Sequence, residues 1–345
     1  MNIPSTLISS ILKTYGLDTS FSEQEEYLYF YKKYGYNVKA VFSVLLQNKQ
    51  RVVIKIVNIE HNDFHQDTIK TENQSTFSEL LRHNGIVTPK YYMANGKYCN
   101  QFVCNDFPCN VTVEDWCGEE ITEITTDLSY KIGELTARMH VISLNNNASI
   151  GFPTIWSAIT KNDADAYEDF CEICKNENLN QTIVKQIIKH RNAKLQSLLA
   201  VWDDLPKTAV QGDISINNLT LQDNVLTVFD YNCAGDEVLV SDLVLEGLLT
   251  AYEMELPEGA DPSIRQQLFP AFLNGYLSVR QLSKAEADAA WTIYTMFTSL
   301  WFSKICYTDN SLENLVNKED YSSANKLLTQ ILADLTRSND GRFIR

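Results

Sequence analysis

The sequence lacks any long hydrophobic run. No segment approaches the ~20 continuous apolar residues that span a membrane. The first residues, MNIPSTLISSILKTYGL, alternate polar and apolar positions instead of forming a basic stretch followed by an apolar one, as a secretory leader does. From these two absences we expect a cytoplasmic protein with no membrane-inserted part.

Cysteine is present but too scattered for a disulfide scaffold. Secreted scaffolds concentrate cysteines in a short chain, whereas these eight are spread over 345 residues. Cys171 and Cys174 form a CxxC, but no second cysteine or histidine pair accompanies them, and the surrounding FCEICK is typical of a helix. His61 and His65 lie in a polar stretch, where two solvated side chains are commoner than two metal ligands. We therefore expect reduced thiols and no zinc site.

Basic residues are scarce. Twenty-nine Lys and Arg stand against 44 Asp and Glu, which gives a formal net charge of −15. Such a charge repels nucleic-acid backbones and anionic lipid head groups, so we expect neither nucleic acid nor a membrane surface as a partner. An acidic field also attracts cationic ligands, but acidic surfaces commonly serve solubility alone, and we favour that second interpretation.

The first third of the chain has the pattern of a β-rich lobe. A short amphipathic helix is expected at 4–16, and the β-branched runs 38–46 and 51–57, joined by polar residues, predict a hairpin. A helix is expected over 67–83 with Asn84-Gly85 as its end. Further strand signals follow at 91, 98–104 and 110–116.

From residue 125 onward the pattern is mainly helical. The expected helices are 128–140, 164–176, 182–202, 242–253, 263–277, 284–306 and 321–337. Only 207–235 interrupts them, with a strand-turn-strand pattern. We find no internal repeat. The composition shift predicts an α+β architecture with an N-terminal lobe at 1–113, a connector at 114–120 and a helical lobe at 121–345.

The most informative stretch is QGDISINNLTLQDNVLTVFDYNCAG, residues 211–235. A turn at 222–224 joins two short strands, so an antiparallel hairpin sets Asn218 nearly opposite Asp230. An amide and a carboxylate are hard oxygen donors that suit Mg²⁺, which usually takes one or two protein ligands together with nucleotide phosphates. We predict Asn218 and Asp230 as magnesium ligands. Asp213, five residues before Asn218, would then lie close to the γ-phosphate.

Phosphoryl transfer needs alignment, charge neutralisation and an acceptor for the proton of the attacking hydroxyl. Asp213 fits the last role, and we predict it as the catalytic base. Any one of these residues alone is more often structural, since aspartates close turns and asparagines cap strands. Their joint spacing is what favours the catalytic interpretation. His140 and Asp242, at helix ends, are expected to be structural.

This arrangement, D-x(4)-N with a strand-terminal Asp twelve residues later, resembles the catalytic and metal-binding loops of the aminoglycoside phosphotransferase and choline kinase superfamily, relatives of protein kinases. Lys55 in VVIKIV looks like the lysine that contacts the α- and β-phosphates. The stretch at 111–121 looks like the strand and hinge that hold adenine, and IGELTARMH at 132–140 looks like the helix after the hinge. The resemblance extends over roughly residues 40 to 300.

The resemblance implies a bilobal protein-kinase-like fold, with a β-rich N-terminal lobe containing one main helix and a mostly helical C-terminal lobe. It also implies ATP or GTP as phosphate donor, Mg²⁺ as cofactor, and adenine bound by the backbone of Glu114 and Trp116. The acidic partner of Lys55 would be Glu72 or Glu79, which share one helix face. We leave that choice open.

Two departures from the family pattern stand out. The catalytic loop begins with Gln211 where relatives usually have histidine, and a glutamine amide can still donate and accept the bracing hydrogen bonds. The expected phosphate loop, KYGYNV at 33–38, has a single glycine, Gly35. We therefore expect the loop to be held by its side chains as much as by flexible backbone. Asn37 is a candidate phosphate contact in this loop.

We therefore expect a small-molecule kinase that phosphorylates a hydroxyl group. Aminoglycoside-like, choline-like, homoserine-like and amino-sugar acceptors remain open, bound in the helical lobe near 151–169, Glu253 and Trp301. The alternative is a nucleotide-binding pseudokinase that regulates a partner. The presence of Lys55 and of all three loop residues counts against it.

Overall fold

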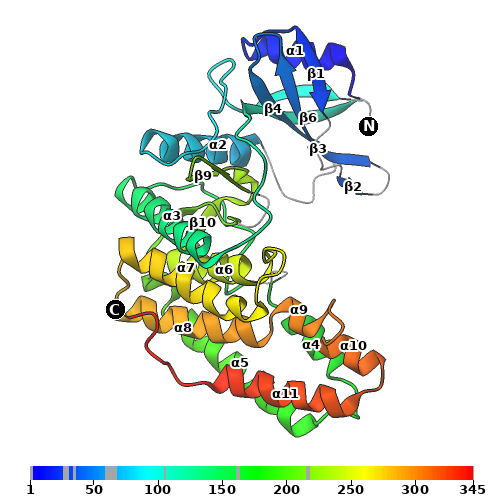
Figure 1. The fold of residues 1–345 in the computed structure, drawn as a ribbon, viewed down its shortest axis with the longest axis vertical. Helices are drawn as coiled ribbons and strands as arrows, with labels where there is room; N and C mark the ends of the chain where they lie inside the picture. The colour runs from blue at the N-terminus through cyan, green and yellow to red at the C-terminus, as the bar shows by residue number, and fades with distance from the viewer. Residues whose placement is uncertain are drawn as a thin grey trace. The chain divides into compact units, whose positions relative to one another are not determined.

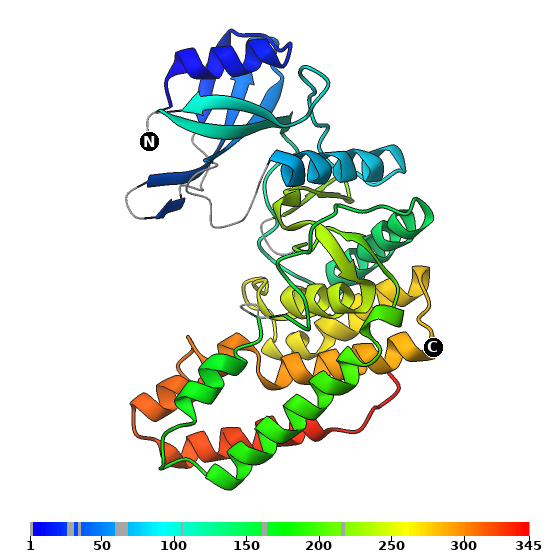
Figure 2. The same cartoon turned by 180° about the vertical axis from the view of Figure 1, so that it is seen from behind.

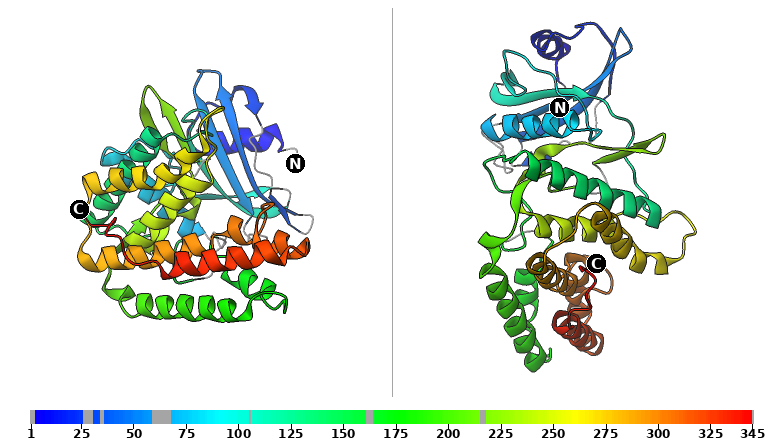
Figure 3. Two further views of the ribbon diagram at one scale, coloured as in Figure 1. Left: turned by 60° about the horizontal axis from the view of Figure 1, so that its bottom comes forward. Right: turned by 90° about the vertical axis from the view of Figure 1, so that its left-hand side faces the viewer.

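The computed structural model describes residues 3–25, 31–33, 36–58, 68–104, 106–160, 164–214 and 218–344, with the backbone alone described at 22–25, 31–33 and 36–38. The chain forms two compact units, drawn in Figure 1 and from other sides in Figures 2 and 3. The first unit combines Met1–Thr122, Ile142–Pro153 and Asp213–Asp236. The second combines Glu123–Val141, Thr154–Gly212 and Glu237–Arg345. The units thus interleave along the sequence, and the division expected at 114–120 stays a prediction.

The first unit is built on an antiparallel sheet. Among the described residues it has six strands, in the order β1-β3-β4-β6-β5, with β2 paired to β3. The strands are β1 (Phe21–Glu25), β2 (Tyr31–Lys33), β3 (Tyr36–Leu46), β4 (Arg51–Asn58), β5 (Asn100–Cys104) and β6 (Phe107–Asp115). The hairpin expected at 38–46 and 51–57 is present as β3 and β4. The register pairs Val41 with Lys55 and Lys55 with Thr112 across β3, β4 and β6.

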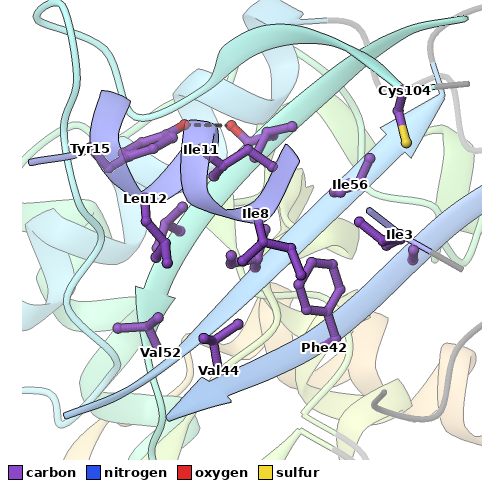
Figure 4. Packing of buried hydrophobic residues seen from close by; sticks show 14 of the residues in the cluster. Ile3, Ile8, Ile11, Leu12, Tyr15, Phe42, Val44, Val52, Ile56 and Cys104 are labelled. Atoms are coloured by element: carbon purple, nitrogen blue, oxygen red, sulfur yellow. Dashed lines mark hydrogen bonds between the residues drawn. The ribbon is translucent and has the colours of Figure 1, made fainter. Parts of the chain in front are cut away.

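One face of this sheet is apolar and is covered by helix α1 (Ser5–Thr14). Ile8, Ile11 and Leu12 project from one side of α1 onto Phe42 and Val44 of β3, as Figure 4 shows. These five side chains are at most 1% exposed. Burying a side chain of this size contributes about 1.5–3 kcal/mol, so this contact holds α1 on the sheet.

Helix α1 ends in a glycine-dependent cap. Gly16 has φ of +68°, and the N–H groups of Gly16 and Leu17 donate to the carbonyls of Lys13 and Leu12, as in a Schellman motif. The hydroxyl of Tyr15 then lies 2.6 Å from the carbonyl oxygen of Val111 in β6. The cap therefore aims an anchoring side chain at the sheet.

The remaining elements of this unit are helix α2 and a hairpin. Helix α2 (Thr68–His83) ends in a second Schellman-type cap, in which Gly85 has φ of +87° and the N–H of Ile86 donates to Leu81 O at 3.1 Å. The hairpin consists of β8 (Leu219–Gln222) and β9 (Val225–Val228), followed by the short 3₁₀ helix η2 (Tyr231–Cys233). In Figures 1 and 2 the hairpin lies beside α2.

The second unit is mostly helical. Its helices are α3 (Thr126–Asn145, to Val141 in this unit), α4 (Tyr167–Ile173), α5 (Gln181–Leu199), η1 (Trp202–Asp204), α6 (Leu239–Tyr252), η3 (Pro262–Ile264), α7 (Arg265–Val279), α8 (Lys284–Ser299), α9 (Phe302–Ile305), α10 (Leu312–Asn317) and α11 (Tyr321–Thr336). Strand β7 (Lys207–Val210) pairs with β10 (Gly235–Val238). Figure 3 shows α5 and α11 side by side. In the described part of the chain no helix is both long and apolar enough to cross a membrane.

Helices α3 and α7 cross at two glycines. A Cβ atom on Gly133 would lie 1.9 Å from Phe272 O, and one on Gly275 would lie 1.9 Å from Tyr130 O. Glycine is therefore needed at both positions for the backbones to approach this closely. At the same crossing, buried His140 contacts Tyr276 Oη and Asp242 Oδ2, each at 2.8 Å, so this histidine links three helices.

The helix expected over 284–306 is wrong in its length. It stops at Ser299, and a separate short helix begins at Phe302. The carbonyl of Leu300 accepts a hydrogen bond from Ala166 N at 3.1 Å, and Trp301 bridges to Asp165. Tertiary pairing of Leu300 and Trp301 with 165–166 accompanies the break between the two helices, and periodicity alone does not reveal it.

Buried Glu237 in β10 makes the stability of the second unit sensitive to pH. Burial raises the pKa of its carboxyl from 4.5 to about 7. Because the folded pKa is raised, this carboxyl stabilises the fold fully below about pH 4.5, and the contribution is lost as the pH rises through about 7.

We expect Glu237→Gln to melt close to wild type at pH 4 and above it at pH 8.5, with a gain of up to roughly 3 kcal/mol in the free energy of unfolding. Thermal and urea unfolding at both pH values measure this. Glu258→Gln makes the same chemical change at an exposed position of the same unit and is the matched control. An equal effect of Glu237→Gln at both pH values would rule out the raised pKa.

Candidate active site

The face of the sheet opposite α1 carries polar side chains. Side chains alternate along a strand, and the register therefore places Lys39 of β3, Lys55 of β4 and Glu114 of β6 on this one face. Asn110 and Thr112 of β6 share it. Lys39, Glu114, Asn110 and Thr112 are all at most 7% exposed. Buried charges need partners, so this face must hold an ionic network.

Lys55 is the centre of that network. Its Nζ lies 2.9 Å from Glu114 Oε1 and 3.1 Å from Asp230 Oδ1. The other oxygen of Asp230, Oδ2, lies 3.5 Å from Lys39 Nζ. The first unit thus brings two lysines and two carboxylates together from β3, β4, β6 and the end of the β8–β9 hairpin.

The network keeps its members charged. Burial alone would lower the pKa of Lys55, but Asp230 and Glu114 outweigh it, and the net pKa is raised. Burial alone would raise the pKa of Asp230, but Lys39 and Lys55 outweigh it, and the net pKa lies well below the usual range. Asp230 is therefore a carboxylate at every physiological pH, as a metal ligand must be.

Neither Glu72 nor Glu79 is the partner of Lys55. The carboxylate of Glu72 accepts hydrogen bonds from the backbone N–H groups of Tyr98 and Cys99, at 2.9 and 2.7 Å. The carboxylate of Glu79 is held by Arg82 at 2.6 Å and by Tyr91 N at 2.9 Å. Both acids lie on a face of α2 that turns toward the segment 91–99. The sequence expectation is corrected accordingly: the partners of Lys55 are Glu114 and Asp230.

A different face of α2 reaches the pocket beside Lys55. Thr71, Gln74 and Ser75 line this pocket together with both lysines, Thr112 and Asp230. Gln74 Nε2 donates to the carbonyls of Asn232 and Ala234, at 2.8 and 2.9 Å. The glutamine thereby ties α2 to the backbone that follows Asp230.

The loop residues Asp213 and Asn218 lie together at the start of the hairpin. Asn218 Nδ2 donates to Asp213 O at 2.7 Å and to Asp213 Oδ2 at 3.2 Å. The thiol of Cys233 in η2 donates to Asp213 Oδ2 at 3.7 Å. Burial raises the pKa of this thiol well above 9, so it remains a donor. Ser215 to Asn217 lie outside the described residues.

The hairpin register sets Asn218 opposite Phe229, one residue before Asp230. Leu219 pairs with Val228, and the carbonyl of Asn218 accepts from Phe229 N at 3.0 Å. Asp230 itself has φ of +53° and ψ of +81°, a left-handed conformation that is unusual for any residue other than glycine. Such strained backbone is concentrated at functional sites, where surrounding contacts hold it in place.

The residues present fit a magnesium ion. Because the amide nitrogen of Asn218 faces Asp213, its oxygen is directed away from it, and with Asp230 it supplies the hard oxygen donors that Mg²⁺ prefers. The described residues contain no cluster of three or more His, Cys, Asp or Glu able to hold a metal alone. The amide oxygen of Asn218 and the carboxylate of Asp230 suit an ion that takes one or two protein ligands and completes its shell with phosphate oxygens.

The expected adenine contacts are only in part compatible with the sheet. Glu114 lies within β6, with Val53 of β4 as its register partner, and its side chain binds Lys55. The N–H of Trp116 already donates to Arg51 O at 3.1 Å. An adenine contact through that N–H would have to break this bond. Asn37 belongs to β3 by its backbone, but its side chain and Gly35 lie outside the described residues.

Lys39, the carboxylate of Glu114 and Gln74 were missed by sequence reasoning. A signal for Lys39 was present: counting back from the turn at 47–50 sets Val41 opposite Lys55 and places Lys39 on the same face. The role of Glu114 depends on the pairing of β4 with β6, which are far apart in the sequence. That pairing has no local signal.

The chain matches no described protein family by sequence, and no curated protein matches it by sequence either. Solved structures do match it. They include a microcompartment-associated aminopropanol kinase (TM-score 0.60, 15% identity, 99% of each chain covered) and amicoumacin kinase hAmiN in complex with AMP-PNP, Ca²⁺ and Ami (0.59, 14%, 96% of this chain and 95% of that one). An aminoglycoside phosphotransferase from Alicyclobacillus acidocaldarius matches with TM-score 0.57 and 11% identity over 97% of this chain and 96% of that one.

These likenesses extend over nearly the whole chain. They show that it has the fold of small-molecule kinases, and the α+β, protein-kinase-like fold expected from the sequence is confirmed.

Proposed function

We propose that the chain is a kinase that transfers the γ-phosphate of ATP, or of GTP, to a hydroxyl group of a small molecule with the help of Mg²⁺. The observation that carries the proposal is the meeting of Lys55, Asp230, Asn218 and Asp213 within one unit of a small-molecule kinase fold. Four separate structural roles would have to coincide to produce the same set. The structure solved with AMP-PNP and Ca²⁺ belongs to a protein of this fold and supports the choice of nucleotide and divalent metal.

Each residue has a role in this proposal. When bound, Mg²⁺ neutralises charge on the phosphates and aligns them. Asp230 and Asn218 hold the ion through oxygen atoms, and Lys55, fixed by Glu114 at 2.9 Å, contacts the α- and β-phosphates. Asp213 orients the acceptor hydroxyl and takes its proton.

The acceptor site belongs, in this proposal, to the second unit. Trp301 Nε1 donates to Glu253 Oε1 at 3.1 Å, and the rings of Tyr252 and Trp301 lie 6.0 Å apart. Burial raises the pKa of Glu253. A carboxylate next to aromatic rings suits an amine, and the similar structures include kinases named for aminopropanol and aminoglycosides. We therefore favour an acceptor that carries both a hydroxyl and an amino group.

A panel screen tests the proposal. The purified chain is incubated with ATP or GTP, Mg²⁺ and a panel of hydroxylated amines, sugars and antibiotics, and release of nucleoside diphosphate is measured. Acceptor-dependent release supports the kinase. Nucleotide binding without release for any acceptor supports the alternative, a pseudokinase with a regulatory partner. No nucleotide binding at all would contradict both.

A further inference from the structure

A second lysine faces the same pocket as Lys55. Lys39 comes from β3, and its side chain is 8% exposed. Both lysines line the pocket, together with Thr71, Gln74 and Ser75 of α2. The α2 residues that line it are uncharged, because the acidic residues Glu72 and Glu79 of this helix are directed elsewhere. Among the described residues, Glu114 of the sheet and Asp230 supply carboxylates to the two lysines.

The two lysines differ in their carboxylate partners. Lys55 has Glu114 at 2.9 Å, a carboxylate of the sheet itself. Lys39 faces Asp230 Oδ2 at 3.5 Å, and Asp230 is the carboxylate assigned to the metal. When Asp230 turns its oxygens to a divalent cation, the anion facing Lys39 changes, whereas the pair of Lys55 and Glu114 is unaffected. A phosphate oxygen in the same pocket can then take the place of that carboxylate oxygen beside the Lys39 ammonium.

We infer that Lys39 is a second phosphate-binding cation, whose Nζ binds a non-bridging oxygen of the terminal phosphates of a nucleoside triphosphate once Asp230 holds the metal. The inference rests on the proposed function and extends it. Asp230 then exchanges two ammonium partners for the metal, and the phosphates gain both ammonium groups. The triphosphate and Asp230 thus bind the same pair of lysines in alternation.

The test compares nucleotides with different phosphate content. Binding of ATP with Mg²⁺, and of adenosine, is measured by titration calorimetry for wild type, Lys39→Met and Lys39→Arg. We expect Lys39→Met to weaken ATP binding by about 10- to 100-fold, the loss of one charge-assisted hydrogen bond, and to leave adenosine binding unchanged. Lys39→Arg keeps the charge and is expected to recover most of the ATP affinity.

The control is Lys97→Met, which removes a lysine from an exposed position of the same unit and is expected to bind ATP as wild type does. If Lys39→Met does not fold, Lys39→Gln is used in its place, because glutamine keeps a hydrogen-bond donor toward Asp230. The same loss of ATP affinity is expected for Lys39→Gln. Unchanged ATP affinity in the Lys39 variants, or an equal loss for ATP and adenosine, would overturn the inference alone. Failure of wild type to bind ATP would instead overturn the proposed function.

Discussion

Asp230→Ala is expected to reduce turnover by about 10³-fold or more and to remove the Mg²⁺ dependence of nucleotide binding. The variant loses the carboxylate that holds the metal in the proposed function. It also leaves Lys39 and Lys55 without the anion that lies 3.5 and 3.1 Å from them. Triphosphate charge in the site would then be compensated by lysines alone.

Calorimetry with ATP in the presence and absence of Mg²⁺ measures this effect. Wild type is expected to bind ATP more tightly with the metal, and Asp230→Ala to bind it similarly under both conditions. Each protein thus serves as its own control, and urea unfolding checks that the variant is folded. An Asp230→Ala variant with the wild-type response to Mg²⁺ would remove the metal assignment.

Asp213→Asn should separate chemistry from binding. The substitution keeps the shape of the side chain and an oxygen that accepts from Asn218 Nδ2, at 3.2 Å in the present structure, but it removes the proton acceptor. A general base contributes typically ~10²–10⁴-fold, so kcat should fall by about that factor while the Kd for ATP stays nearly constant. In a loose transition state the hydroxyl is deprotonated late, so part of the loss is lost orientation of the hydroxyl.

Steady-state kinetics with an acceptor from the screen, together with ATP titration, decide this prediction. Asp223→Asn is the matched control, since it makes the same change at an exposed position in the turn of the same hairpin. Near wild-type turnover in Asp213→Asn would require both the base assignment and the kinase interpretation of this loop to be abandoned.

Local patterns predicted the parts of the site that lie close together in the sequence. The turn at 222–224 was enough to predict the hairpin and to bring Asn218 within one residue of facing Asp230, because hairpin register follows from turn length. Lys55 was visible as a charge within an apolar strand. Gly85 marked the end of α2 because only a residue tolerant of positive φ completes that cap.

The partners of these residues were not predictable in the same way. The choice between Glu72 and Glu79 failed because helical periodicity groups residues on a face but does not say what the face contacts. Both acids satisfy backbone N–H groups in the segment 91–99, which would otherwise be buried without acceptors. The break at Leu300 has the same origin, since the carbonyl there is used by Ala166 from another part of the chain.

The order in which the first unit is synthesised follows from its three stretches of chain. Residues up to Thr122 complete the sheet and α2, but Asp213–Asp236 emerge from the ribosome only after α3, α4 and α5. Until then the nascent sheet carries Lys39, Lys55 and Glu114 on one face, without Asp230. Domains generally fold as they emerge, N-terminal part first. This face of the sheet is therefore completed only when Asp213–Asp236 has been synthesised. A translational pause before residue 213 would lengthen the time for which this face of the sheet lacks Asp230.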